Sequence, residues 1–323
     1  MSRTRTPVSV AHTETAPSSA AADAFVVGMG AQVWNLALAP DGRRAASACL
    51  DGTLRIWDTA DGRVLHTLRE TGPSIGRVAF AADGRLAWAG PDGTVRLIDP
   101  SDGRVRQALP GHGVIRGVAF RPDGRRLAVA DGQTVRVWDT AEGREVLTVP
   151  GPPGDDVMAV AFAPNGRLTT AGADGFVRHW DSGTGAAGAV LSAHPRHVLT
   201  VAHSPDGRQL LTAGVDGTAR LWDAATGGLR HTFALRPGTP ARSVFTPDGR
   251  RVITVGTDRY ARVWDPGSGK ELLALAGDTD VVTSVAVSPD GRRIFTGAND
   301  GTVRVWEADP PPPDVLARRR LAW

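Results

Sequence analysis

The chain has 323 residues, of which 41% are hydrophobic, with 39 Gly, 23 Pro and a formal charge of +3. Apolar residues recur evenly from about residue 25 to 307, which excludes a disordered chain, and abundant Gly favours short elements joined by tight turns over long helices. The single cysteine, Cys49, excludes an internal disulfide and a Cys-based metal site.

Residues 1–22 are rich in Ser, Thr, Ala and Arg, and we expect a disordered tail. They lack a continuous apolar core, so we expect no secretory signal, and no apolar run in the chain is long enough for a membrane span. We therefore expect a cytoplasmic protein. The next apolar segment, Phe25-Val26-Val27, is a candidate strand.

After this segment the sequence is organised as a repeat. Near the end of an apolar stretch, seven units carry a pair that is Trp-Asp or close to it. The pairs are Trp57-Asp58, Ile98-Asp99, Trp138-Asp139, Trp180-Asp181, Trp222-Asp223, Trp264-Asp265 and Trp306-Glu307. Their spacing of 40 to 42 residues is the period of a repeat architecture.

Each unit predicts four short strands. A first alternating strand ends in a Pro-Asp-Gly-Arg type turn such as Pro289 to Arg292, in which Pro presets φ and Gly supplies a positive φ. An Asp-Gly hairpin turn such as Asp300-Gly301 joins the second strand to the third, which ends at the Trp. A fourth strand follows, for example at residues 271–275.

Four antiparallel strands per repeat are typical of a propeller blade, and blades must stack because none can bury both faces alone. We therefore predict an all-β, seven-bladed β-propeller over residues 23–309. The last unit ends at Glu307 and is followed by Pro310 to Pro313, which cannot supply a ladder strand. We predict that Phe25–Val27 completes the last blade and closes the ring. Residues 310–323 are interpreted as a proline-rich spacer and a basic tail.

These motifs resemble the WD-repeat family over residues 33–307. The near-exclusive use of Arg, with Lys270 as the single Lys, suggests a member of bacterial type from a GC-rich genome. The resemblance implies a hydrogen-bonded tetrad within a blade, and blade five carries the full set, which is His194, Thr212, Asp216 and Trp222.

Other blades depart from the family pattern. Blade two has Gly72-Pro73 in place of Gly-His, Trp88 in place of the hydroxyl and Ile98 in place of Trp. Blade three keeps Gly111-His112 but has Ala128 and Gly132 where a hydroxyl and Asp are expected. Blades one, four, six and seven keep the turn Asp but lack the His, and blade six has Asp258-Arg259 in its turn. Blade two is the least typical.

The resemblance also implies a non-enzymatic scaffold for protein–protein interaction, in signalling or complex assembly. Family members contact partners on the top face, at the start of the first strand and just before the turn Asp. Carried over, these positions nominate a partner-binding set of Trp34, Leu50, Arg116, Met158, Leu199 and Val215. The alternative is that these residues pack against neighbouring loops. We expect a protein or peptide partner and a monomer.

Other functions have less support. Arginines recur at fixed repeat positions around the ring instead of clustering, so we expect no nucleic-acid binding. A propeller enzyme, a hydrolase or cofactor-dependent oxidoreductase using the central channel, is the alternative. It needs converging acid, base or metal ligands, whereas the top-face positions supply one acid, Asp131, and no His. No sequence motif for a metal or cofactor site occurs.

Overall fold

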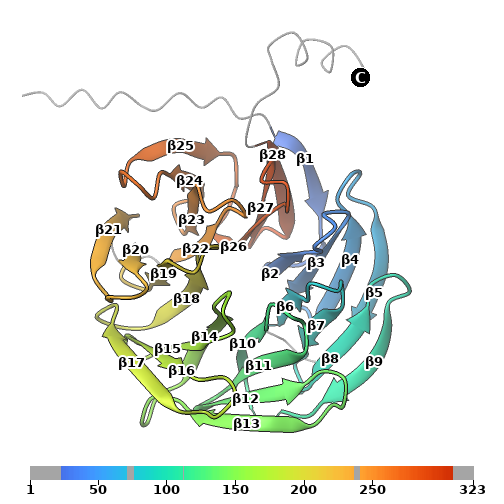
Figure 1. Ribbon diagram of the computed structural model, residues 1–323. Coiled ribbons are helices and arrows are strands. Elements are labelled where there is room, and N and C mark those ends of the chain that lie inside the picture. Colours follow the sequence, from blue (N-terminus) through green and yellow to red (C-terminus); the bar gives the residue numbers. More distant parts are fainter. Residues whose placement is uncertain (1–22, 71–75, 112, 236–240, 308–323) are drawn as a thin grey trace, which may run out of the picture.

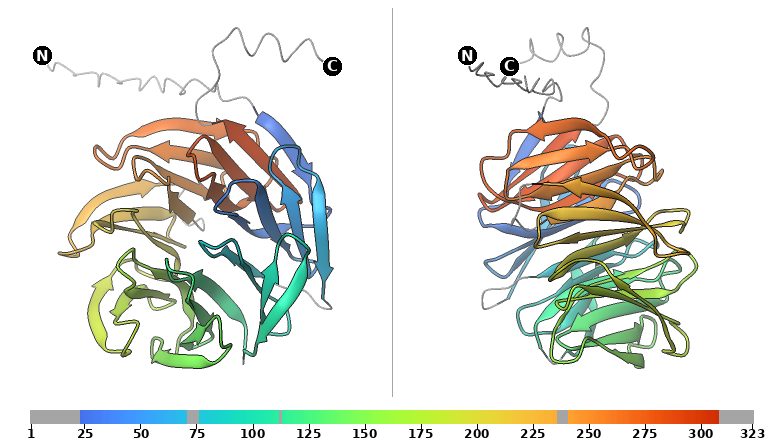
Figure 2. Two further views of the ribbon diagram at one scale, coloured as in Figure 1. Left: turned by 45° about the vertical axis from the view of Figure 1, so that its right-hand side comes forward. Right: turned by 90° about the vertical axis from the view of Figure 1, so that its left-hand side faces the viewer.

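The computed structural model describes residues 23–70, 76–111, 113–235 and 241–307. These residues form 28 strands in seven four-stranded antiparallel sheets, arranged as a ring of blades around a central axis (Figures 1 and 2). The predicted seven-bladed propeller is confirmed.

Blades one to four contain, from the innermost strand outward, β2 (Val33–Leu38), β3 (Arg44–Cys49), β4 (Thr53–Asp58) and β5 (Val64–Arg69); β6 (Arg77–Phe80), β7 (Leu86–Ala89), β8 (Val95–Asp99) and β9 (Arg104–Leu109); β10 (Ile115–Phe120), β11 (Arg126–Asp131), β12 (Thr134–Asp139) and β13 (Glu145–Pro150); and β14 (Val157–Phe162), β15 (Leu168–Gly172), β16 (Phe176–Trp180) and β17 (Ala187–Ser192). Blades five to seven contain β18 (Val198–His203), β19 (Gln209–Gly214), β20 (Thr218–Asp223) and β21 (Leu229–Ala234); β22 (Ala241–Phe245), β23 (Val252–Gly256), β24 (Tyr260–Trp264) and β25 (Glu271–Ala276); and β26 (Val282–Val287), β27 (Arg293–Ala298), β28 (Thr302–Glu307) and β1 (Asp23–Gly28). We call the end of the ring at which the innermost strands begin the top face.

The turns form as the sequence predicts. In the first turn of blade one, Asp41 Oδ1 accepts the Arg43 N–H at 2.9 Å and Gly42 adopts a φ of 68°. In blade six, the Asp258-Arg259 turn between β23 and β24 places Arg259 at a φ of 68°, and among the described residues it is the one non-glycine with a positive φ. An L-residue pays a steric cost there that glycine avoids, so this turn is the most strained of the set.

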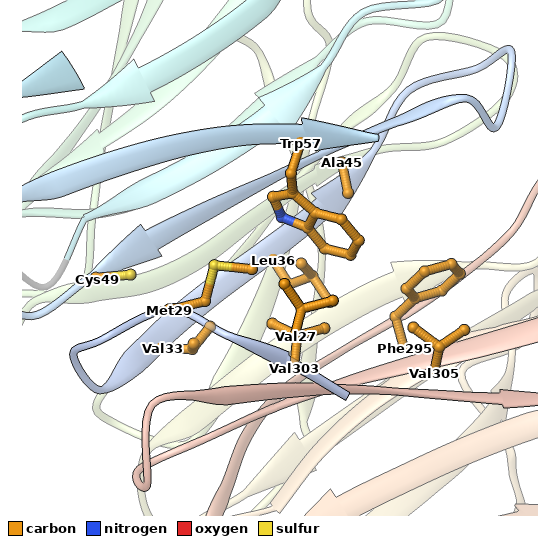
Figure 3. Close-up of a cluster of buried hydrophobic side chains, with 10 residues drawn as sticks. All are labelled: Val27, Met29, Val33, Leu36, Ala45, Cys49, Trp57, Phe295, Val303 and Val305. Atoms are coloured by element: carbon orange, nitrogen blue, oxygen red, sulfur yellow. The ribbon is translucent and has the colours of Figure 1, made fainter. Parts of the chain in front are cut away.

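The hydrophobic core lies between adjacent blades. Figure 3 shows the cluster between blades seven and one, where Trp57 from β4 packs at 6.1 Å from Phe295 of β27, ring centroid to centroid. Both side chains are fully buried. Each blade thus hides the face of its neighbour, which is the reason that the repeats must stack.

The ring is closed by its first strand. β1 pairs antiparallel with β28, with Phe25 opposite Val305 and Val27 opposite Val303. Val27 and Met29 are buried in the same cluster as Trp57 (Figure 3). The predicted closure of the last blade by Phe25–Val27 is confirmed.

Several sequence predictions lie outside the described residues. They are the tail 1–22, the spacer and tail 310–323, Gly72-Pro73 and His112. Within the described ranges, no helix is long and apolar enough to cross a membrane, and no group of three or more His, Cys, Asp or Glu could hold a metal ion.

Candidate functional site

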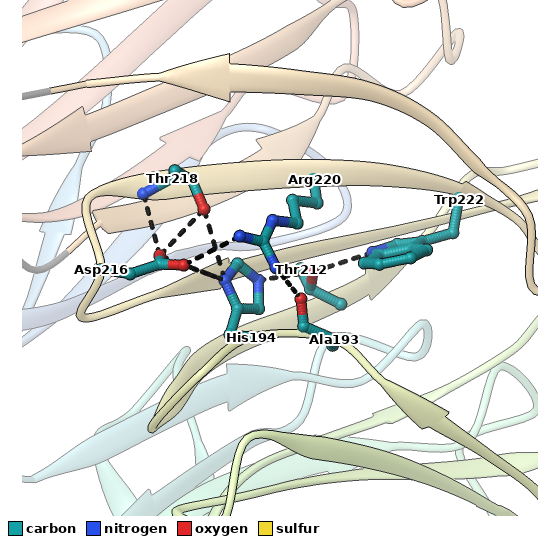
Figure 4. Close-up of polar contacts among 7 residues, drawn as sticks. All are labelled: Ala193, His194, Thr212, Asp216, Thr218, Arg220 and Trp222. Carbon is teal, nitrogen blue, oxygen red and sulfur yellow. Dashed lines mark hydrogen bonds and ion pairs between the residues drawn. The ribbon is translucent and has the colours of Figure 1, made fainter. Parts of the chain in front are cut away.

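Blade five contains a buried polar chain of four residues (Figure 4). His194 Nδ1 lies 3.1 Å from both carboxylate oxygens of Asp216, and its Nε2 lies 2.8 Å from Thr212 Oγ1. Trp222 Nε1 donates to the same Thr212 oxygen at 3.0 Å. Because the Asp216 carboxylate can only accept, His194 carries its proton on Nδ1 and accepts the Thr212 hydroxyl at Nε2. The structure thus brings together the four residues that the resemblance nominates.

The tetrad has a structural role within the blade. Thr212 and His194 are buried, and burial lowers the pKa of His194 despite the opposing effect of Asp216. A neutral imidazole therefore satisfies the hydroxyl and the carboxylate at once, so the buried polar atoms of this tetrad all have a partner.

Blade seven carries a substitute that the sequence analysis missed. Asp278 precedes Asp300 by the same separation as His194 precedes Asp216 (278 to 300, 194 to 216), and its side chain takes the place of the imidazole. Thr296 Oγ1 donates to Asp278 Oδ2 at 3.1 Å, and Arg304 Nε lies 3.2 Å from Asp278 Oδ1. The equal separation from the turn Asp in the two blades is the sequence signal that could have identified Asp278.

The hydrogen bond from the Trp indole to the Ser or Thr hydroxyl occurs in more blades than the His does. Five blades have it, at 2.8 to 3.0 Å, from Trp57 to Ser47, Trp180 to Thr170, Trp222 to Thr212, Trp264 to Thr254 and Trp306 to Thr296. Where the His is lacking, Met29 in blade one and Pro152 in blade four are buried at its position. Packing therefore replaces the polar contact in these blades.

Blade two is built differently. Trp88 stands at the hydroxyl position on β7, opposite Arg96 in the register, and its ring lies 5.8 Å from the Arg96 guanidinium carbon. Arg96 also pairs with Glu70 and with Asp92. In blade two the buried indole is therefore on the second strand, whereas in the other blades it is on the third.

The top-face end of the channel encloses a cavity of about 300 Å³. Three members of the nominated partner-binding set, Arg116, Met158 and Leu199, line it at the second residue of their innermost strands. Arg77 and Arg242 line it as well. The nominated positions from blades three, four and five therefore converge on one concavity.

Trp34 of blade one lies beside this cavity, close to two of the arginines that line it. Its ring centroid is 6.0 Å from the Arg77 guanidinium carbon and 5.9 Å from that of Arg242. Leu50 and Val215 are half-buried just beyond the ends of β3 and β19, outside the cavity lining. Of the six nominated residues, four therefore gather at the channel entrance and two lie farther out.

Sequence reasoning missed Arg77 and Arg242 because the strands differ in register. In blade one, the pairing of β2 with β3 shifts between Val33 and Asn35, so Trp34 is an extra residue. β6 and β22 pair with their neighbours without such a shift. The alignment to the family placed Gly76 and Ala241 at these positions, both of which are buried, and passed over the arginine that follows each.

The entrance is electrostatically unusual. Burial, with contributions from Arg242 and Arg116, lowers the pKa of Arg77 to about 9, and burial lowers that of Arg242 to about 10. Arg116 is paired, since its Nη2 lies 2.7 Å from Asp156 Oδ2. The cavity lining itself contains no Asp or Glu among the described residues.

A second polar cluster joins blades four and five. Thr169 Oγ1 lies 2.9 Å from both His179 Nδ1 and His203 Nε2. Burial, with His179 and Arg167 nearby, lowers the pKa of His203 to about 4, and burial also lowers that of His179. Both imidazoles are therefore neutral in the folded protein at pH 7.

This cluster predicts a loss of stability in weak acid. Because the unfolded chain takes up a proton near pH 6.5 and folded His203 only near pH 4, stability falls as pH drops through that window. Between pH 7 and pH 5 we expect His203 to account for about 2 kcal/mol of unfolding free energy. Urea unfolding at both pH values measures it. His203→Phe should remove this part of the pH dependence, since other blades have Phe at this position; an unchanged dependence would contradict the assignment.

The comparisons with known proteins agree with this geometry. The model of the family described as "WD domain, G-beta repeat" matches residues 26–58, 103–139, 143–181, 186–223, 234–265 and 269–307. The long unmatched stretch, 59–102, holds β6 to β8 of the atypical blade two. The comparison with curated proteins gave no match. With the family model covering most of a closed seven-bladed ring, the chain belongs to the WD-repeat family.

Proposed function

We propose that the protein is a non-enzymatic scaffold that binds a protein or peptide partner on its top face, in signalling or the assembly of a complex. WD-repeat propellers typically bind proteins, which is the coarse function that family membership supplies. The observation that carries the proposal is the convergence of Arg116, Met158 and Leu199 on the entrance cavity, with Trp34 next to two arginines that line it. Trp, Arg and Met are enriched in interface cores.

The same cavity supports binding over catalysis. A hydrolase or oxidoreductase site needs acid, base or metal-binding groups that converge on one point. The described lining instead combines guanidinium groups with Met, Leu, Val and Ala side chains and with the uncharged polar groups of Asn35, Thr200, Ser243 and Ser284. Such a mixture of apolar and cationic groups suits recognition of a polypeptide surface.

Affinity capture from the native cell, read by mass spectrometry, tests the proposal. We expect the wild-type protein to retain a defined partner and the double variant Trp34→Asp/Leu199→Asp to lose it. Both side chains are half-buried at the cavity, so the variant should keep its melting temperature within a few degrees. Val64→Asp on outer strand β5, where Val64 is 40% exposed, is the control. Equal capture by the double variant would refute the top-face assignment.

A further inference from the structure

We propose that the channel entrance recognises a carboxylate of an acidic peptide segment, held by Arg77 and Arg242 next to Trp34. We call these three residues together with Arg116 the arginine entrance. The inference rests on the proposed function and deepens it, because it gives the chemistry of the segment that enters the cavity.

Part of the hydrogen-bonding capacity of the arginine entrance is not used by the described residues. Arg77 Nε donates to the Arg116 carbonyl at 2.6 Å, but its Nη1 is buried and has no partner among the described residues. Trp34 Nε1 is buried and without a partner in the same sense. The Arg242 side chain lies near the Trp34 ring but has no hydrogen bond or ion pair with the described residues. Buried donors and charges of this kind are costly unless an acceptor reaches them.

Arginines at another repeated position, two residues before the Trp, are paired with acids, unlike Arg77 and Arg242. In four blades, the Arg that stands two residues before the Trp forms an ion pair with the Asp four residues before that Arg. The pairs are Arg55–Asp51, Arg178–Asp174, Arg220–Asp216 and Arg262–Asp258. At the arginine entrance only Arg116 has such a partner, Asp156. Arg77 and Arg242 therefore give the cavity a net positive charge.

The repeat does not require arginine at these two positions. In the pairing register, Arg77 and Arg242 correspond to Asn35, Gly117, Ala159, Thr200 and Ser284 of the other blades. All of these are small or uncharged. The fold therefore does not need an arginine at either position. Both arginines line the channel, and both come from blades whose innermost strand pairs without a register shift.

The surroundings favour a peptide over a free inorganic ion. Met158 and Leu199 line the same cavity, and Trp34 offers an aromatic face beside the two guanidinium groups. A volume of about 300 Å³ holds one or two side chains and is small for a cofactor. An Asp or Glu next to an apolar residue matches both the charge and the apolar wall.

Fluorescence anisotropy with labelled octapeptide pools tests the proposal. One pool has Glu-Leu fixed at its centre, and the matched pool has Gln-Leu there with the same mixed flanks. We expect the full-length protein to bind the Glu pool at least about tenfold more tightly, an advantage that shrinks as NaCl is raised. Arg77→Met/Arg242→Met should abolish the difference. Arg167→Met, an exposed arginine of another cavity beyond the far end of β14, should leave it unchanged.

Each other outcome overturns the proposal. Equal binding of the Glu and Gln pools excludes carboxylate recognition. A pool with central phosphoserine-Leu that binds more tightly than the Glu pool assigns the site to phosphopeptides, and full displacement of the Glu pool by millimolar inorganic phosphate alone assigns it to the free ion. Should the double variant melt early, the single variants Arg77→Gln and Arg242→Gln give the same comparison.

The failure of this inference can be told from failure of the proposed function. If the pools bind equally while Trp34→Asp/Leu199→Asp still abolishes partner capture, the top face binds a partner by other chemistry. If capture survives that double variant, the proposed function itself is wrong.

Discussion

Removing residues 1–30 should lower the melting temperature by at least about 10 °C. The deletion takes away β1, exposes the edge of β28 and opens the cluster around Trp57, from which Val27 and Met29 are lost. Burial of each such side chain contributes about 1.5–3 kcal/mol, and the backbone ladder adds to this. Differential scanning calorimetry measures the effect.

The control for this truncation is a chain that lacks only residues 1–22. It retains all of β1 and every described contact. We expect its melting temperature to stay near that of the full chain. If the 1–30 deletion melted like the 1–22 deletion, closure by β1 would contribute nothing to stability and the account of the last blade would be wrong.

Thr212→Val should destabilise the protein by about 2–4 kcal/mol although it preserves side-chain volume. The hydroxyl serves two buried partners, since it accepts from Trp222 Nε1 and donates to His194 Nε2. Leaving a buried donor or acceptor unsatisfied costs about 1–3 kcal/mol each. Urea unfolding near pH 7 measures the loss.

The chain supplies a matched control in blade four. Thr170 is buried like Thr212 and accepts from Trp180 Nε1 at 3.0 Å, but no His lies in that blade's tetrad position. Thr170→Val should therefore cost about half as much, and Thr212→Ser should keep most of the stability. Equal losses for the two Val variants would show that the imidazole contact adds nothing.

The parts of the fold that the sequence predicted are those set by local chemistry. The spacing of the Trp-Asp pairs and the Asp-Gly and Pro-Asp-Gly turns each act within a few residues, and together they fix four strands per repeat. Ring closure followed from counting strands, because the last repeat lacks its fourth. The tetrad of blade five followed from the resemblance, as all its members are ordinary for the family.

The parts that were missed depend on contacts between distant residues. Arg77 and Arg242 could not be placed because one residue more or less in the first strand shifts the position that faces the channel. Arg77, Arg242 and Trp34 come from blades two, six and one, and a repeat pattern in the sequence does not show that three such distant residues lie close together. The cluster of Thr169, His179 and His203 likewise spans two blades.

Pairing of β1 with β28 also sets the order of events during synthesis. β1 is the first of the 28 described strands and pairs with β28, the last of them, so its partner is synthesised after every other strand of the ring. Contacts of such long sequence separation form slowly. An incomplete chain exposes an unpaired strand edge, which is prone to join other chains, so we expect nascent chains stalled before β28 to aggregate where complete ones do not.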